Sequence, residues 1–146
     1  MPNALDGPPA SSYLKTLPEA ECYELLAVAI VGRIGFVSAA AGVQILPVNF
    51  RLGPGHRLFM KTSPHGTVAQ LAQIDAPVAF EVDHHADDFG IAWSVLMSGT
   101  LRFLDPEASA AYAELRLPPV PWPGLATTVT IQFVPETISG RGLHRP

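Results

Sequence analysis

Two consecutive stretches of alternating apolar residues, within residues 77–104, constrain the fold of this chain more than any other feature. In residues 77–83 every second side chain is apolar, which is the period of a strand with one buried side. Residues 93–103 repeat the pattern, with apolar side chains at the odd positions and mostly polar ones between them. A strand of that length normally bends to serve two sheets or the wall of a barrel, and Gly99 lies where a bend can form. The spacing therefore predicts a β-barrel.

Further alternating segments bring the expected number of strands to six. An Ala-rich link that ends at Gly42 separates two of these segments and favours a hairpin turn. In another of them, alternation puts Phe59 and Lys61 on one face and Leu58 and Met60 on the other. The additional strands are expected at residues 31–38, 43–50, 56–61 and 127–134.

Short helices are expected between the strands, so that the fold class is mainly β with short helices. The first helix begins with a capping box formed by Thr16 and Glu19, and it continues to about Ala29. Cys22 lies on its apolar face and is expected to be a small buried side chain, because no basic neighbour is evident that would make it a reactive thiol. The other two helices are expected at residues 68–74 and 106–115.

The length of the chain, 146 residues, is that of one domain. Residues 1–13 contain several prolines and few apolar anchors, so we expect a flexible arm there and a single domain over residues 14–146. The chain is 48% hydrophobic and only 15% charged, against about 25% charged in an average domain. We therefore expect a ligand or a second copy of the chain to cover part of its apolar surface.

Charge and segment composition exclude several classes of partner. The net charge of -4 argues against a general nucleic-acid surface. The sequence contains no apolar run long enough for a membrane span and no signal-peptide pattern at its start, so we expect no membrane association and a cytoplasmic location. The single cysteine excludes an internal disulfide. The expected partners are a small-molecule substrate and another copy of the chain.

The junction after the strand expected at 56–61 is the first place where the sequence suggests a ligand. Lys61, Thr62 and Ser63 precede a helix start near Thr67. Together they offer a cation, hydroxyl donors and unpaired backbone amides, a set that suits a phosphate dianion. Alternatively, Ser63 or Thr67 only caps the helix while Lys61 is solvated. The local pattern leaves both interpretations open.

Two other features have less specific interpretations. A polar cluster resembles a metal site in composition, but adjacent histidines in a strand point to opposite faces, so we expect a solvated loop and no metal. Trp122 lies in a Pro-rich loop at residues 117–124, where it could pack on a partner chain or on its own barrel. The polar cluster consists of Asp83, His84, His85, Asp87 and Asp88.

Familiar catalytic patterns are missing from the sequence. The pair Gly32 and Gly35 lies inside an expected strand, so it is no dinucleotide fingerprint. No nucleophile elbow or paired cysteine and histidine signature is present. If the chain is an enzyme, its reactive group is expected to belong to a cofactor.

The order of the expected elements, together with a series of local phrases, resembles the pyridoxamine 5'-phosphate oxidase-like family of flavin-binding split β-barrels. The resemblance covers residues 17–143. The phrases are GRIGF at 32–36, PVNF at 47–50, FEVD at 80–83, WSV at 93–95 followed by Gly99, and ISGR at 138–141.

This resemblance implies a six-stranded split β-barrel that forms a homodimer, with FMN held in two clefts at the interface. In the family, one segment lines the flavin ring, a second holds the phosphate, and two others approach the cofactor. Carried over to this chain, the ring segment is Pro47, Val48, Asn49 and Phe50; the phosphate segment is Lys61, Thr62, Ser63, Gly66, Thr67 and Val68; and the approaching residues are Trp93, Ser94, Val95 and Arg141.

The sequence departs from the family pattern at three positions. Lys61 stands where relatives often have arginine, which replaces a bidentate contact by a point charge. Val68 stands where many relatives have a second phosphate-binding lysine, and Gly142 replaces a second arginine. We therefore expect weaker FMN binding. The resemblance implies an FMN-dependent oxidoreductase of unassigned substrate; the alternative is a non-catalytic module that binds flavin, deazaflavin or haem on the same barrel.

Overall fold

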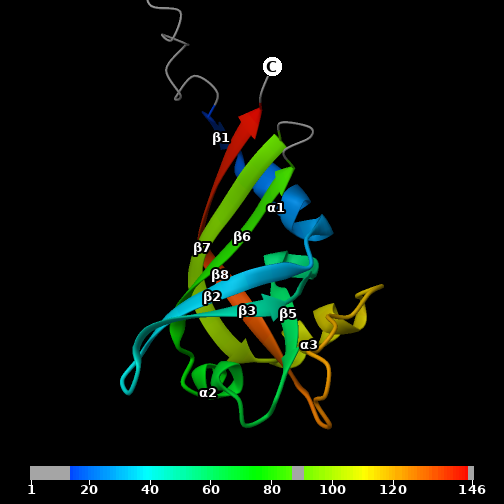
Figure 1. Cartoon of the computed structure of the whole chain (residues 1–146). Coiled ribbons are helices and arrows are strands. Elements are labelled where there is room, and N and C mark those ends of the chain that lie inside the picture. Colours follow the sequence, from blue (N-terminus) through cyan, green and yellow to red (C-terminus); the bar gives the residue numbers. More distant parts are fainter. Residues whose placement is uncertain (1–13, 87–90, 145–146) are drawn as a thin grey trace, which may run out of the picture.

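The computed structural model describes residues 14–86 and 91–144. Within them, eight strands form one antiparallel sheet in the order β3-β2-β6-β7-β8-β5-β4, with β1 paired to β8 (Figure 1). The strands are β1 Leu14–Leu17, β2 Val31–Ser38, β3 Gly42–Asn49, β4 Arg51–Leu52, β5 Leu58–Thr62, β6 Pro77–Ala86, β7 Ile91–Phe103 and β8 Val129–His144. The helices are α1 Glu19–Val28, α2 Thr67–Gln73 and α3 Pro106–Ala113, with a 3-10 turn at Pro54–His56.

Strands β6, β7 and β8 are the longest and lie side by side (Figure 1). The alternation that predicted β6 and β7 from sequence is confirmed by their pairing, in which Val82 lies opposite Val95 and Phe80 opposite Met97. The register between β7 and β8 shifts between Ser98 and Gly99, at the position where the sequence predicted a bend. A side chain at Gly99 would collide with the backbone of β8, so close approach of the two strands requires glycine here.

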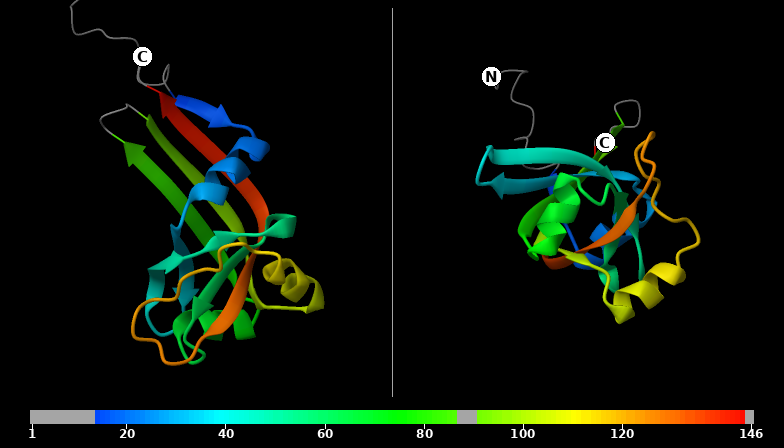
Figure 2. Two further views of the ribbon diagram at one scale, coloured as in Figure 1. Left: turned by 90° about the vertical axis from the view of Figure 1, so that its right-hand side faces the viewer. Right: turned by 90° about the horizontal axis from the view of Figure 1, so that it is seen from below.

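The sheet curls on itself and encloses the main core (Figure 2). Three phenylalanines meet at its centre: the ring of Phe80 lies 5.3 Å from that of Phe50 and 5.1 Å from that of Phe133. All three are fully buried, and each contributes about 1.5–3 kcal/mol through the hydrophobic effect. The core thus joins β6 and β8 to the segment that follows β3.

Strand β5 separates the main core from a second, smaller one. Leu58 and Met60 point into the main core, whereas Phe59 packs on the opposite face with Ala108 and Ala111 of α3. Since side chains alternate along a strand, Lys61 belongs to the face of Phe59. The predicted division of this strand into two faces is confirmed.

The predicted capping box at the first helix is wrong. Thr16 lies in β1, where it pairs with Arg141 of β8, and the residue that precedes α1 is Pro18, which makes no side-chain capping bond. Thr16 takes part in strand pairing, which fixes it away from the helix start. By contrast, α3 has a side-chain cap, because the carboxylate of Asp105 accepts a hydrogen bond of 2.7 Å from the backbone nitrogen of Ala108.

The sheet has eight strands in the described residues, not the predicted six. The short strands β1 and β4 were not expected, and β8 continues to His144, where a tail was expected. His84 and His85 lie in β6, paired with β7, and not in a loop. In each case backbone pairing with a neighbouring strand outweighs a polar or glycine-containing local sequence. Asp87, Asp88 and the predicted arm at 1–13 lie outside the described residues.

Cys22 is fully buried in α1, as predicted. Its burial, together with nearby Glu21, raises the pKa of its thiol. No helix in residues 14–86 and 91–144 is both long and apolar enough to cross a membrane. Over the same residues, histidine, cysteine and acidic side chains nowhere gather in threes as a metal ion would need.

Candidate functional site

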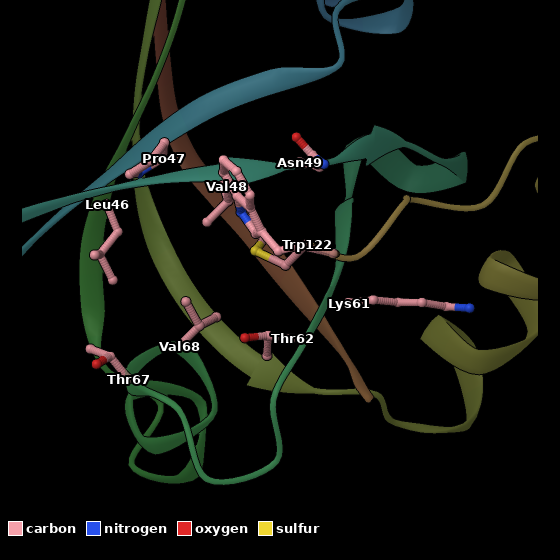
Figure 3. A pocket seen from close by; sticks show the side chains of 10 residues that line it. Leu46, Pro47, Val48, Asn49, Lys61, Thr62, Thr67, Val68 and Trp122 are labelled. Carbon is pink, nitrogen blue, oxygen red and sulfur yellow. The ribbon is translucent and has the colours of Figure 1, made fainter. Parts of the chain in front are cut away.

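A cleft of about 310 Å³ opens between β3 and β5, and we call it the β3–β5 cleft (Figure 3). The end of β3 forms one wall, the end of β5 the opposite wall, and the start of α2 the floor. A segment of the loop between α3 and β8 completes it. The lining residues are Leu46, Pro47, Val48, Asn49, Met60, Lys61, Thr62, Thr67, Val68 and Trp122.

One wall of the cleft is the edge of the sheet. Strand β3 stands at the end of the strand order and pairs only with β2 among the described strands. Alternate residues of such a strand direct their backbone groups away from the neighbouring strand. Phe50 donates to Ile30 in this ladder, so Val48 uses its backbone groups on β2, whereas Pro47 and Asn49 direct theirs outward. Asn49 thus offers an N–H and a carbonyl to a ligand in the cleft, and Pro47 offers a carbonyl.

The interior of the cleft is apolar. Val48, Met60 and Val68 are buried side chains that belong to the main core, and each also contributes to the wall of the cleft. Leu46 and the indole of Trp122 extend this surface toward the opening. Such a wall suits a flat aromatic ring better than a chain of polar groups.

Hydroxyl groups supply most of the polarity on the α2 side. Thr62 points across the cleft toward Val68 (Figure 3). Thr67 lies next to Val68 at the start of α2, on the side away from Thr62. The residue before α2 is Gly66, and the helix start has no side-chain capping bond. The interpretation in which Ser63 or Thr67 only caps this helix is therefore wrong, and the Thr67 hydroxyl is not committed to a cap.

Lys61 contributes to the wall of the cleft, but its side chain extends away from Thr62 and Val68 (Figure 3). The direction follows from the alternation along β5, which puts Lys61 on the same face as Phe59. Lys61 is the one charged residue among those that line the cleft. The cleft consequently presents hydroxyls and backbone groups, with the lysine ammonium directed toward the α3 side of β5.

The remaining residues of the two predicted binding segments lie close by but contribute differently. Ser63 and Gly66 belong to the turn between β5 and α2, where the nitrogen of Gly66 donates to the carbonyl of Ser63 over 3.1 Å. Phe50 is fully buried in the main core, against Phe80. Its side chain is thus part of the support behind the cleft, not of its surface.

Trp93 does not line the β3–β5 cleft. It lies in the extended part of β7, where its ring stacks on that of His84 at 6.1 Å. It borders one cavity of about 300 Å³, shared with Gly142 and Leu143, and another of about 550 Å³, shared with the end of α1 and His84. Val95, two residues on, is fully buried in the core.

The departure at Gly142 has a packing reason. A side chain there would begin 3.0 Å from the side chain of Leu17, and one at neighbouring Gly140 would meet the sulfur of Cys22. The contact of β1 and α1 with β8 therefore favours glycine at both positions. An arginine at position 142 would require Leu17 to move.

The outer face of the sheet, turned away from the main core, combines predicted site residues with exposed apolar ones. Register pairs Ser94 with Arg141 and Arg33 with Pro47 on this face. Arg33 lies 2.9 Å from Glu81 and 3.0 Å from Asp83, and these carboxylates raise its pKa. We call this surface the outer sheet face; its exposed apolar side chains are Val37, Val43, Ile45 and Leu96.

Two features were not predicted from sequence as parts of a site. Trp122 is one of them: the sequence left open whether it packs on its own chain, and the structure places it at the β3–β5 cleft. The other is a hydrogen bond of 3.0 Å from the side-chain amide of Asn49 to the carbonyl of Val120. The proline-rich composition of residues 117–124 was the one available signal, because it indicates a stiff loop.

The chain is similar to known proteins in both sequence and structure. The sequence profile described as pyridoxamine 5'-phosphate oxidase matches residues 18–142. No curated protein sequence matches the chain significantly.

Three solved structures illustrate the similarity of fold. The FAD binding protein from Mycobacterium smegmatis is 27% identical, with a TM-score of 0.73 over 90% of this chain and 100% of that one. A conserved protein of unknown function from Corynebacterium diphtheriae is 25% identical, with a TM-score of 0.66 over 90% and 98%. A FAD-binding protein from Mesorhizobium loti, 20% identical, has a TM-score of 0.68 over 88% and 97% and shares the fold.

Proposed function

The chain belongs to the pyridoxamine 5'-phosphate oxidase family, and on that premise we propose that it is a homodimeric FMN-dependent oxidoreductase whose substrate is unassigned. The proposal has three parts: a flavin in the β3–β5 cleft, a second copy of the chain on the outer sheet face, and catalysis by the bound flavin. Each part depends on different residues and can fail separately.

The observation that carries the flavin assignment is the open edge of β3 beside an apolar wall. A flavin ring system is flat, and one of its ends carries carbonyl and N–H groups while the other is hydrocarbon. The outward backbone groups of the β3 edge offer matching partners: the N–H and carbonyl of Asn49 and the carbonyl of Pro47. Val68 and Met60 offer the apolar surface. The residues present therefore fit the ring.

The phosphate of FMN would lie at the α2 side of the cleft. Thr62 and Thr67 line the cleft there, and the turn with Ser63 and Gly66 adjoins it. This set offers hydroxyls with little positive charge, because Lys61 extends the other way (Figure 3). We therefore expect the phosphate to contribute less to affinity than in a site with converging cations.

The similarity to the M. smegmatis FAD binding protein supports a flavin but leaves the nucleotide open. The volume of the β3–β5 cleft, about 310 Å³, lies at the lower end of the range for small-molecule sites. An adenosine group would have to lie outside it. FMN is for this reason the nucleotide that we propose.

A homodimer is supported by the outer sheet face. Val43 is 83% exposed and Ile45 is 64% exposed on the same face of β3, although both are large apolar side chains. Grouped exposure of this kind marks an interaction surface. Arg141 and Ser94 lie on this face as well. A second copy that covers the face would bring Arg141 and Ser94 of each chain near the β3–β5 cleft of the other chain. The proposed site is shared between two copies.

FMN supplies the redox chemistry by accepting and returning a hydride. The part of the chain is to hold the ring at the edge of β3, to keep water from one side of it with Val68 and Met60, and to fix its phosphate with Thr62 and Thr67. The cleft lining contains no carboxylate, imidazole or thiol. Proton transfer by a side chain of this cleft is therefore not part of the proposed mechanism.

That same lining favours a second candidate function, a non-catalytic flavin-binding module. A protein that stores or senses a flavin needs the ring pocket but no acid or base. Reduction of the bound flavin by a nicotinamide or dithionite, followed by mixing with a range of acceptors, separates the two functions. Turnover with any acceptor supports the oxidoreductase, and its complete absence supports the module.

Titration of the purified protein with FMN, FAD, riboflavin, a deazaflavin and haem tests the cofactor assignment. A perturbed flavin absorbance at tens of micromolar is expected with FMN. Unchanged flavin bands with every flavin would contradict the proposal, and a response to haem or deazaflavin alone would assign the cleft to that group. Light scattering tests the dimer: a mass near the 15.6 kDa of one chain would refute it.

A further inference from the structure

Asn49 connects the wall of the β3–β5 cleft to a loop that lies far away in sequence. Its side-chain nitrogen donates to the carbonyl of Val120 over 3.0 Å, across a separation of 71 residues. The side-chain donor of Asn49 is therefore engaged with the loop and not directed at a ligand. This differs from a role in which Asn49 itself binds the cofactor through its amide.

The loop at residues 117–124 has few other constraints. It contains four prolines, and proline has no N–H to donate to a neighbouring strand. No backbone hydrogen bond joins this loop to a helix or a strand, and its residues all belong to the described part of the chain. Pro119 is buried and anchors it, while Val120 and Trp122 are 58% and 53% exposed. The bond from Asn49 is consequently a main determinant of where the loop lies.

Trp122 follows Val120 by two residues and lines the β3–β5 cleft together with Val68 and Met60. Half of its surface is accessible although the indole borders an apolar wall. Tryptophan in this situation offers a large, stiff contact surface to an aromatic ligand. A bound ring would cover the part of the indole that is exposed.

We propose that Trp122 is a ligand-contacting residue of the β3–β5 cleft and that Asn49 is a positioning residue, which holds Trp122 in place through the Val120 carbonyl. The inference rests on the proposed function, because it takes the ligand to be a flavin. It adds that retention of the ring depends on a loop outside the sheet. The loop and the β3 edge then hold the ring from two sides.

Because Asn49 acts only through Trp122, the proposal predicts how the losses in flavin-binding free energy of the two variants combine. Removal of either side chain weakens flavin binding, and removal of both weakens it no further than removal of Trp122 alone. A residue that contacts the ligand directly gives additive effects instead. The two mechanisms thus differ in a double-mutant cycle.

The experiment measures the dissociation constant of riboflavin, FMN and FAD by flavin fluorescence for wild type, Trp122→Ala, Trp122→Phe, Asn49→Ala and the Asn49→Ala/Trp122→Ala double variant. Gln44→Ala is the matched control, because it removes another amide-to-carbonyl hydrogen bond at the β2–β3 hairpin, away from the cleft lining. Circular dichroism verifies that each variant is folded. Trp122→Ala is expected to weaken binding roughly tenfold, Trp122→Phe less, Asn49→Ala several-fold, and Gln44→Ala not at all.

The possible outcomes separate the inference from the function on which it rests. Wild type that binds flavin, with Trp122→Ala equally tight, overturns the inference and leaves the proposed function intact. Additive losses in the double variant overturn the positioning role of Asn49. Wild type that binds no flavin overturns both. Non-additive losses, together with quenching of Trp122 emission by flavin in a Trp93→Phe background, support the inference.

Discussion

Val68→Lys tests the assignment of the phosphate end of the cleft by adding a positive charge beside α2, from which Lys61 is directed away. Val68 lies at the second position of α2 and points into the β3–β5 cleft, opposite Thr62 (Figure 3). It is 5% exposed and belongs to the main core. A lysine here can keep its hydrocarbon stem on the same apolar wall and extend its ammonium along the cleft toward Thr67.

Two effects are expected: tighter binding of FMN and a lower free energy of unfolding without ligand. A charged hydrogen bond to the phosphate contributes about 1.5–3 kcal/mol, which tightens FMN binding about 10- to 150-fold. Replacement of a packed valine by a longer side chain costs roughly 1–3 kcal/mol of folding free energy. The variant is therefore expected to be less stable without ligand and to bind FMN more tightly than wild type.

Comparison of FMN with riboflavin isolates the phosphate, since the two share the ring and differ in that group. Fluorescence titration should show a tighter FMN complex for Val68→Lys and no gain for riboflavin. Gln73→Lys is the control, because it adds the same charge to the exposed end of the same helix, outside the cleft lining. It should leave both dissociation constants unchanged.

Equal gains for FMN and riboflavin, or no gain for FMN in a folded Val68→Lys protein, would refute the placement of the phosphate beside α2. If circular dichroism shows that Val68→Lys does not fold, Thr67→Lys carries the same test. Thr67 is exposed at the rim of the cleft, so a lysine there disturbs no core packing.

Three further predictions concern the dimer, the sheet and the buried thiol. Ile45→Asp places a carboxylate on the outer sheet face, and light scattering should show a shift from dimer to monomer with loss of flavin binding; an unchanged mass would exclude this face as the interface. Gly99→Ala forces a methyl group against the backbone of β8, so denaturant titration should show a loss of roughly 1–3 kcal/mol, whereas wild-type stability would mean that the strands separate freely. Burial raises the pKa of the Cys22 thiol, so the folded state holds the proton more tightly than the unfolded state. This contribution to stability is fully present below the pKa of an exposed thiol, about 8.5, and is lost as the pH rises through the pKa of the folded state. Native protein should react slowly with a disulfide reagent at pH 8 and rapidly in denaturant; similar rates would show that Cys22 is accessible.

The strands that the sequence predicted well are those with strict alternation over many residues. The β2 bounds, Val31–Ser38, coincide with the prediction, and β7 differs from it by two residues at its start. Alternation of apolar and polar residues can be recognised from neighbouring residues alone, and in these strands the apolar face that it identifies is the face that packs in the core. The two short strands, β1 and β4, carry too few residues for any period to be recognised.

The chain segments that border the cleft were easier to predict than the individual side chains that line it. Sequence placed Lys61 and Phe59 on one face of their strand, but it could not show that the ammonium of Lys61 would extend away from the rest of the cleft lining. That depends on which side of β5 α3 covers, which is a tertiary contact. Trp122 was missed as a cleft residue for the same reason, because a loop without periodicity gives no direction for its side chains.

The open edge of β3 also bears on how the protein behaves when its ligand is scarce. A strand without a second neighbour is a template on which another chain can add by hydrogen bonding, and β3 carries no charged side chain to discourage this. Pro47 interrupts that template, because it offers no donor in the middle of the exposed edge. Pro47, which we propose borders the flavin, is thus also expected to limit aggregation of the protein without its ligand, and replacing it should make expression without flavin yield inclusion bodies.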